Sequence, residues 1–140
     1  MLFMRFETKD DLNREINAIR MFVDTFGGYY KKLGEHDVDF AVYDRNERLI
    51  AYAEVKGRNR KIDDAFPLPC AARKLVKLSD KKINPVIIWD CLDGIIYGKL
   101  NELEGVAKNG GRKPRNGASN DVELMVYFHD FDDFKVIRRI

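Results

Sequence analysis

An alternating pattern on both sides of a single turn limits the folds open to this chain more than any other feature of its sequence. Residues 37–43 and residues 49–56 each alternate apolar and polar side chains, which is the period of a half-buried β-strand. Between them, residues 44–47 read Asp-Arg-Asn-Glu, residue types that are typical of a turn. The pattern predicts a β-hairpin whose first strand places three apolar side chains on one face, namely Val38, Phe40 and Val42.

The charged residues of this hairpin gather at its open end. If residues 46 and 47 form the centre of the turn, Asp39 lies opposite Glu54 and Asp37 lies opposite Lys56. Two carboxylates that face each other across a strand pair repel, so a divalent cation between Asp39 and Glu54 is the simplest compensation. The same register pairs Ala41 with Tyr52 and Tyr43 with Ile50.

The rest of the chain reads as helices and strands in alternation. Apolar residues recur at helical spacing over residues 12–26, and the run stops at Gly27 and Gly28. The remaining segments are expected to form, in order, a short strand (29–33), a helix (69–78), a strand buried on both faces (85–89), a further strand (94–100), a mobile loop (108–119) and a late strand (122–128). The edge of the sheet is one candidate position for the late strand.

This order of helix, three strands, helix and strand predicts the fold class. A strand–helix–strand connection between residues 49–56 and 85–89 makes those two strands parallel, whereas the strands of a hairpin are antiparallel. We therefore expect an α/β protein in which helices flank a mixed central sheet. The 140 residues correspond in size to a single domain, residues 1–140.

Composition limits the classes of protein to which the chain can belong. Hydrophobic residues make up 45% and charged residues 34% of the chain, so a core is feasible, and no apolar run reaches the length of a membrane span. The apolar start, residues 1–6, is too short for a secretory signal. Cys70 and Cys91 lack metal-ligand spacing and cannot form a disulfide framework, so a cytoplasmic location is expected.

The open end of the hairpin has the residues of a magnesium site. Mg²⁺ binds hard oxygen ligands, usually one or two carboxylates completed by water and substrate phosphate. Asp39 and Glu54 supply the carboxylates, and the backbone carbonyl of Val55 is a third candidate ligand. Lys56 shares a strand face with Glu54 and is placed to orient the attacking water and to stabilise charge on the phosphate. Phosphodiester hydrolysis requires these parts, and Mn²⁺ is expected to substitute for Mg²⁺.

Asp39, followed by Glu54-Val55-Lys56 on the next strand within this order of elements, resembles the PD-(D/E)XK nuclease superfamily. Its members include restriction endonucleases, archaeal-type Holliday junction resolvases and many small phage nucleases. The resemblance spans roughly residues 12–89 and implies a restriction-endonuclease-like αβββαβ core. It also implies that the aspartate and the glutamate bind the metal and that the lysine assists the water.

Accessory positions of the superfamily also have candidates in this chain. Some members add a glutamate from the first helix, which Glu15 matches, and others add a basic or amide residue from the helix after the motif. Asp37 stays open as an alternative to Asp39 for the metal ligand, although the hairpin register favours Asp39. For the basic position Lys74 is preferred, and the alternatives are Arg73 and Lys77.

Basic residues gather after the motif, although the net charge of the whole chain is only +2. Residues 56–82 contain nine basic and three acidic side chains, and residues 108–119 contain four basic side chains without an acidic one. Such clusters neutralise DNA phosphates. The candidates for DNA contact are Arg58, Arg60, Lys61, Arg73, Lys77, Arg112, Lys113 and Arg115.

Together these features predict a small Mg²⁺-dependent endonuclease that hydrolyses the phosphodiester bonds of DNA. A single domain leaves no second unit for base reading, so structure-specific or weakly sequence-selective cleavage is expected, in phage-type recombination, repair or DNA processing within the host cytoplasm. A homodimer would allow both strands to be cut, whereas a nucleotide cofactor and a membrane partner are not expected. The alternative is a non-catalytic module on the same fold that binds nucleic acid or protein.

Overall fold

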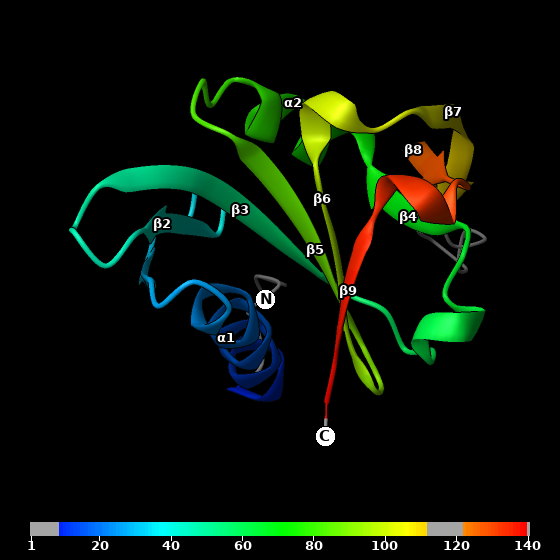
Figure 1. The fold of residues 1–140 in the computed structure, drawn as a ribbon. Helices are drawn as coiled ribbons and strands as arrows, with labels where there is room; N and C mark the ends of the chain where they lie inside the picture. The colour runs from blue at the N-terminus through cyan, green and yellow to red at the C-terminus, as the bar shows by residue number, and fades with distance from the viewer. Residues whose placement is uncertain (1–8, 112–121, 140) are drawn as a thin grey trace.

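The computed structural model describes residues 9–111 and 122–139. A six-stranded sheet crosses the molecule, and β3 and β5 in it are parallel, whereas its other neighbouring strands are antiparallel. The predicted mixed sheet is therefore confirmed. The strand order is β1 (Tyr29–Lys32), β2 (Phe40–Tyr43), β3 (Leu49–Gly57), β5 (Pro85–Cys91), β6 (Gly94–Lys99) and β9 (Lys135–Arg138) (Figure 1).

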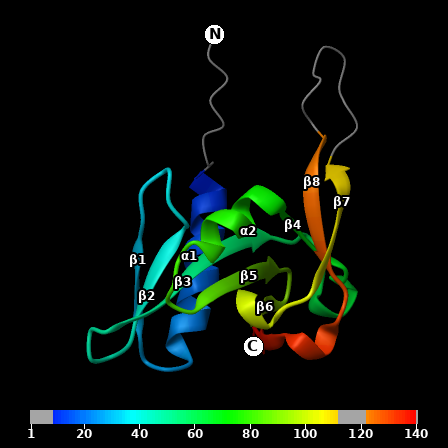
Figure 2. The same cartoon turned by 90° about the horizontal axis from the view of Figure 1, so that it is seen from above.

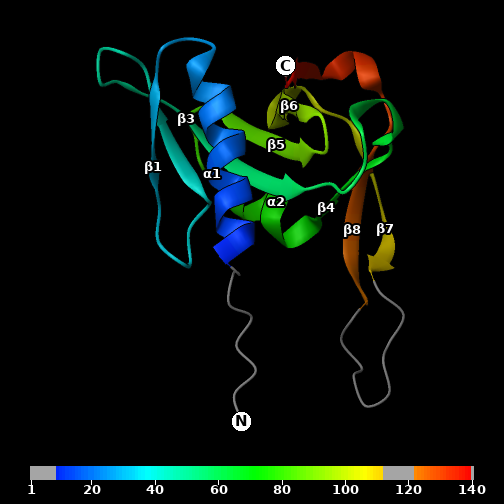
Figure 3. The ribbon, with the colours of Figure 1, turned by 90° about the horizontal axis from the view of Figure 1, so that it is seen from below.

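Both faces of this sheet are covered. Helix α1 (Lys9–Asp24) lies across one face (Figure 3), and helix α2 (Ala72–Ser79) lies over the other together with a second sheet (Figure 2). Coverage on both faces explains why every residue of β5 is buried, and it confirms the predicted α/β class. The second sheet has the order β4 (Leu68–Ala71), β8 (Val122–Phe128) and β7 (Gly105–Gly111), and short 3₁₀ turns lie at Ile62–Asp64, Leu100–Glu102 and Phe131–Asp133.

Helix α1 ends where its sequence predicts. Gly27 adopts a φ of +72°, a left-handed conformation that glycine tolerates without strain. The N–H of Gly28 then donates to the carbonyl of Val23 at 3.0 Å and closes the last turn. Within the described part of the chain, neither α1 nor α2 is long and apolar enough to cross a membrane.

The helix expected from residue 69 begins later than predicted, because the segment before Ala72 forms strand β4. Leu68 and Cys70 both lie fully buried, and this period of two outweighs the tendency of proline to start a helix. Pro69 has no N–H to donate, which an edge strand such as β4 tolerates. Its carbonyl accepts a hydrogen bond from Trp89 Nε1 at 2.9 Å.

The last third of the chain differs from its prediction in two further ways. Strand β8 is the middle strand of the second sheet rather than an edge strand, and residues 108–111, expected in a mobile loop, belong to β7. Their glycine-rich sequence has low strand propensity, but β7 pairs with β8 along its whole length. Gly105 lies so close to Val126 that a side chain at this position would collide with it. The rest of the predicted loop lies outside the described residues.

The register of the predicted hairpin is confirmed over residues 40–42 and shifts at Tyr43, which lies opposite Leu49 instead of its predicted partner. The turn itself differs from a simple two-residue turn. The Asp44 carboxylate accepts hydrogen bonds from two backbone N–H groups within it, and Glu47 adopts a left-handed φ of +64°. The shift is confined to the turn end, and toward the open end the ladder stops at the pair of Phe40 and Ala53.

Candidate active site

The alternation of the first hairpin strand breaks at Asp39. Val38 packs in the core cluster that includes α2 residues, whereas Phe40 packs in the cluster that includes α1 residues. The two side chains therefore lie on opposite faces of the sheet, whereas the alternating pattern predicts that they share one face. β2 begins only at Phe40, so Asp39 contacts β3 through its own side chain and N–H rather than through the regular ladder.

Asp39 and β3 exchange two hydrogen bonds. The N–H of Val55 donates to Asp39 Oδ2 at 2.8 Å. The N–H of Asp39 donates in return to Glu54 Oε2 at 3.1 Å. These bonds bring together the two carboxylates that the register predicts to be opposed, and they hold Asp39 against the backbone between Glu54 and Lys56.

Glu54 is a buried carboxylate, with 2% of its surface exposed. Burial raises its pKa, and the nearby charge of Asp39 raises it further. Lys74 lowers this pKa in part, because Lys74 Nζ lies 3.5 Å from Glu54 Oε1, and Lys56 also lowers it. The net shift of the pKa is upward, because burial is the largest of these effects.

Helix α2 presents three basic residues, and they have different partners. Lys74 reaches Glu54, as preferred for the accessory basic position. Arg73 instead forms an exposed ion pair with Glu123 of β8, with Arg73 Nε 3.0 Å from Glu123 Oε2. The charge of Lys77 acts on Asp37. Of the three, Lys74 is the one that the structure brings to the motif.

Glu15 joins the site through a residue that the sequence analysis missed. Lys32 Nζ, at the end of β1, lies 3.0 Å from Glu15 Oε2 and 3.6 Å from Asp39 Oδ1. The ammonium also lies 4.9 Å from the ring centroid of Phe40, its partner in the ladder. The sequence holds no local signal for this contact, because the place of Lys32 beside Asp39 depends on the pairing of β1 with β2.

Asp37 lies outside this arrangement. Its carboxylate accepts from Lys81 Nζ at 2.7 Å, and this bond lowers the pKa of Asp37. The predicted opposition of Asp37 to Lys56 is not part of the strand ladder, which begins at Phe40. Of the two aspartates, Asp39 is therefore the one that shares hydrogen bonds with the Glu54-Val55 segment.

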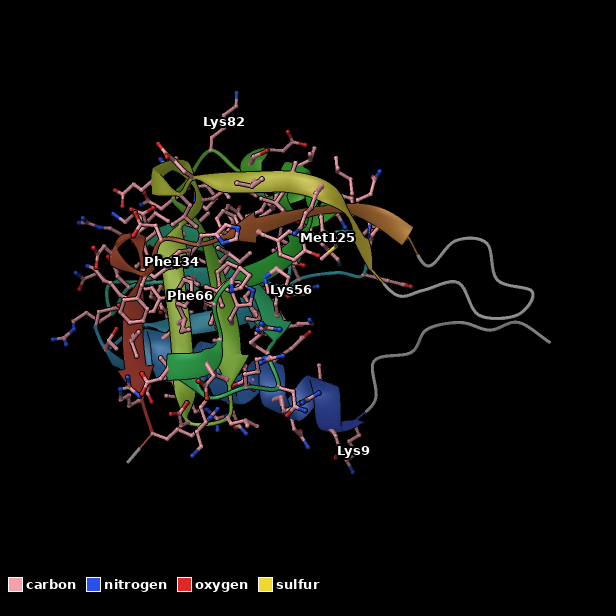
Figure 4. All side chains as sticks on the ribbon, turned by 90° about the vertical axis from the view of Figure 1, so that its right-hand side faces the viewer. Lys9, Lys56, Phe66, Lys82, Met125 and Phe134 are labelled. Atoms are coloured by element: carbon pink, nitrogen blue, oxygen red, sulfur yellow. The ribbon has the colours of Figure 1, made fainter. Side chains whose placement is uncertain are left out.

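Lys56 follows two residues after Glu54 on β3 and is half-buried. Its ammonium is one of the charges that lower the pKa of Glu54, so Lys56 lies close enough to act on the Glu54 carboxylate. Figure 4 shows Lys56 well inside the outline of the molecule, while Lys82 projects outward at the rim. Glu15, Asp39, Glu54, Lys56 and Lys74 thus converge from α1, the start of β2, β3 and α2.

A family model described as "Phage putative PDDEXK endonuclease" matches residues 1–137 of the chain. The chain belongs to this family. The resemblance seen in the Asp39 and Glu54-Val55-Lys56 pattern is therefore confirmed, and it extends over the C-terminal third as well. The chain has no significant match among curated proteins or among solved structures.

PDDEXK nucleases generally use divalent metals, and the donor set of this member fits such an ion. Asp39 and Glu54 offer hard carboxylate oxygens, and the backbone carbonyl of Val55 lies between them and Lys56 in sequence. Burial is the main cause of the raised pKa of Glu54, and the second cause is the neighbouring charge of Asp39, a repulsion that a cation between the two carboxylates would relieve. Within residues 9–111 and 122–139 no group of three or more His, Cys, Asp or Glu side chains surrounds one point. Mg²⁺ needs only one or two carboxylates when water and phosphate complete its shell.

The structure places only some of the predicted DNA-contacting residues near the PDDEXK motif. Arg58 follows β3 and is oriented by the carbonyls of Ala65, at 2.9 Å, and Pro67, at 3.3 Å. Arg60 and Lys61 come next and are exposed. The side chains that lie outside the described residues are those of Arg112, Lys113 and Arg115.

Proposed function

We propose that this PDDEXK protein is a metal-dependent endonuclease that hydrolyses the phosphodiester bonds of DNA. The observation that carries the proposal is the exchange of hydrogen bonds between Asp39 and the Glu54-Val55 segment, one residue before Lys56. Mg²⁺ is the proposed ion, and Mn²⁺ is expected to replace it, because both accept carboxylate, carbonyl and water oxygens.

Asp39 and Glu54 would hold the ion, with the Val55 carbonyl as a third ligand. A divalent ion at this place supplies charge neutralisation for the scissile phosphate and lowers the pKa of a bound water. Lys56 presents its ammonium beside the ligands, where it orients the attacking water and stabilises charge that develops on the phosphate. Lys74 neutralises part of the charge on Glu54 and positions that carboxylate.

DNA is the proposed substrate because basic side chains follow the motif directly. Arg58, Arg60 and Lys61 lie on the segment that leaves β3, and such side chains bind phosphates without reading bases. This supports structure-specific or weakly sequence-selective cleavage, as a phage protein of recombination, repair or DNA processing would perform.

Cleavage assays with a matched lysine control test this proposal. Supercoiled, linear, single-stranded and branched DNA are incubated with Mg²⁺, with Mn²⁺ or with EDTA. The wild type is expected to cut at least one substrate only when metal is present. Lys56→Ala is expected to cut at least about 100-fold more slowly than the wild type, since this is the lower end of the range for loss of a group that assists proton transfer. Lys82→Ala, at the exposed position seen in Figure 4, is expected to cut like the wild type.

Two results would contradict the proposal. If no substrate is cut with either metal while DNA is still bound, the chain is a binding module on a nuclease fold. If Lys56→Ala cuts as fast as Lys82→Ala, the activity does not come from the proposed site.

The position of Lys32 leads to a prediction about metal affinity. Its ammonium lies 3.6 Å from Asp39 Oδ1, so it repels a divalent ion held by the same carboxylate. Lys32→Met is expected to tighten Mn²⁺ binding about fivefold, which corresponds to about 1 kcal/mol for one solvated charge at about 4 Å. Calorimetric titration of the metal-free protein measures this, with the exposed neighbour Lys31→Met as the control. Unchanged or weaker binding in Lys32→Met would show that Lys32 does not oppose the ion.

A further inference from the structure

Lys81 lies just beyond the end of helix α2 and contacts both sides of the hairpin that carries the motif. Its Nζ lies 2.7 Å from Asp37 Oδ1 and 4.6 Å from the ring centroid of Tyr52. Tyr52 belongs to β3 and shares a strand face with Glu54, two residues further on. The ammonium therefore bridges β3 and the segment that leads to Asp39.

The backbone and the side chain of Lys81 are both held. Its N–H donates to the carbonyl of Leu78 at 3.0 Å, and Leu78 is a fully buried residue of α2. The side chain of Lys81 is only 25% exposed, and an ammonium above an aromatic face is attracted by the ring. Lys81 is therefore fixed at both ends, unlike a lysine whose side chain extends into solvent.

Asp37 passes this contact on to Asp39. The Oδ1 that pairs with Lys81 also accepts from the N–H of Val38 at 2.7 Å, and Val38 is fully buried. The carbonyl of Asp39 accepts from the N–H of Leu33 at 3.0 Å. Strand β2 begins only after Asp39, so these contacts, rather than a regular strand ladder, hold the backbone that leads to the proposed ligand.

Helix α2 and the residues that follow it thereby reach both carboxylates of the motif. Lys74 contacts Glu54 directly, with Nζ 3.5 Å from Oε1, whereas Lys81 reaches Asp39 through Asp37. The two lysines lie seven residues apart, which is about two helical turns. One segment of the chain therefore relates the positions of the two carboxylates to each other.

We propose that Lys81 is a positioning residue: through Asp37 it holds Asp39 in the orientation in which its carboxylate binds the metal ion. The proposal rests on the proposed nuclease function, because Asp39 binds the ion in that function. In this role Lys81 touches neither the ion nor the DNA. The alternative is a simple surface ion pair, and such pairs contribute little to stability. The two roles differ in whether the metal site changes when the pair is removed.

Metal affinity tests the proposal through the sign of the effect. Lys81→Met removes a positive charge near the site, and charge alone would make the binding of a divalent ion tighter, whereas loss of positioning makes it weaker. Calorimetric titration of the metal-free protein with Mn²⁺ is expected to show about tenfold weaker binding in Lys81→Met, the lower end of the range for residues that orient metal ligands. Lys82→Met, at the exposed neighbouring position, is expected to bind Mn²⁺ like the wild type.

Hydrogen exchange reports the position of Asp39 without any metal. The N–H of Val55 donates to Asp39 Oδ2, so its exchange with solvent measures whether that carboxylate is in place. In Lys81→Met the amide of Val55 is expected to exchange about tenfold faster, the factor for one hydrogen bond of ordinary strength. The amide of Ile88, on the central strand β5, is expected to keep its rate, because a general loss of stability would accelerate both amides.

Two further variants attribute the effect to the pair of Lys81 and Asp37. Lys81→Arg keeps a cation that can pair with Asp37 and lie over Tyr52, and it is expected to restore the Mn²⁺ affinity and the protection of the Val55 amide. In an Asp37→Asn background, Lys81→Met is expected to have little further effect, because non-additive losses identify residues that act through each other.

The outcomes separate this proposal from the proposed function. Unchanged or tighter Mn²⁺ binding in Lys81→Met, a loss matched by Lys82→Met, or equal acceleration of the Val55 and Ile88 amides would overturn the role of Lys81. If the wild type cleaves DNA with Mg²⁺ in that case, only the role of Lys81 is wrong. If Lys81→Met loses Mn²⁺ affinity and Val55 protection but the wild type cleaves no DNA, Lys81 positions a metal site and the nuclease function falls. A wild type that binds no Mn²⁺ contradicts both.

Discussion

Glu54→Gln is expected to raise the melting temperature of the metal-free protein and, at the same time, to remove its DNA cleavage. In the folded protein Glu54 is 2% exposed, and burial followed by the charge of Asp39 raises its pKa above the ordinary value of 4.5. A carboxyl group whose pKa is raised by folding destabilises the fold once it is ionised. Glutamine removes that charge and keeps an oxygen for the N–H of Asp39.

The sign of this effect gives the experiment its pH window. The folded wild type is favoured when Glu54 is protonated, and its stability is expected to fall as pH rises from the ordinary pKa of a glutamate through the higher folded value. Glu54→Gln lacks this pH-dependent loss. At pH 7.5 its melting temperature is therefore expected to be higher than that of the wild type, by about 4 °C for each 1 kcal/mol that the buried charge costs in a chain of this size.

The same substitution removes one of the two proposed carboxylate ligands. DNA cleavage is expected to fall about 1,000-fold or more, the upper range for loss of a group that stabilises charge in a transition state. Added Mg²⁺ is expected to stabilise the wild type against heat but not the variant, because an ion that binds only the folded state raises its stability. Calorimetric melting curves and the cleavage assay measure both effects.

Glu123→Gln is the matched control, since Glu123 is an exposed glutamate paired with Arg73. It is expected to melt and to cleave like the wild type. A lower melting temperature in Glu54→Gln, with cleavage retained, would show that Glu54 is a structural partner of Lys74 and not a site for a metal.

The largest loss of stability is expected for Trp89→Ala. Trp89 is fully buried on β5, and its ring makes edge contacts with Phe128 of β8 and with Phe134, with centroids 5.7 Å apart in both cases. Its Nε1 donates to the carbonyl of Pro69 on β4. Trp89 therefore joins the central sheet to the second sheet, and alanine removes both the packing and the hydrogen bond.

The expected loss for Trp89→Ala is about 3–5 kcal/mol, the range for large-to-small substitution of a buried aromatic residue. Trp89→Phe keeps much of the ring but leaves the Pro69 carbonyl without its donor, and a loss of about 1–3 kcal/mol is expected. Urea unfolding at equilibrium measures these values. Phe131→Ala, which truncates a ring that is 46% exposed, serves as control and is expected to lose less. A loss in Trp89→Ala no greater than in this control would show that the two sheets are not coupled through Trp89.

The parts of the site that lie close together in sequence could be predicted. The register of a hairpin follows from local alternation and the position of the turn, so the proximity of Asp39 and Glu54 can be predicted from residues 37–56 alone. The place of Lys74 at the site could be predicted in the same way, because the helix after the motif packs back over the strand that carries the motif. Lys32 was not found, since its place beside Asp39 depends on the pairing of β1 with β2, and the short β1 sequence carries no register of its own.

Other differences arose where tertiary contacts outweigh local preference. The prolines before α2 favour a helix start, but the burial of Leu68 and Cys70 produces strand β4. The glycine-rich residues of β7 form a strand only through β8. Between Val38 and Phe40 the buried side chains change from one face of the sheet to the other, and this change turns Asp39 toward β3. The apolar and polar residues of the sequence alternate without interruption here, so the sequence gives no sign of the change.

Strand β4 and helix α2 are contiguous: Ala71 ends one and Ala72 begins the other. This junction has a consequence for how the length of the chain can vary during evolution. Adding or removing a single residue here would rotate α2 by about 100° relative to β4 and turn Lys74 away from Glu54. Natural variants of this protein should therefore conserve the number of residues between Pro69 and Lys74 more strictly than the identity of the residues themselves.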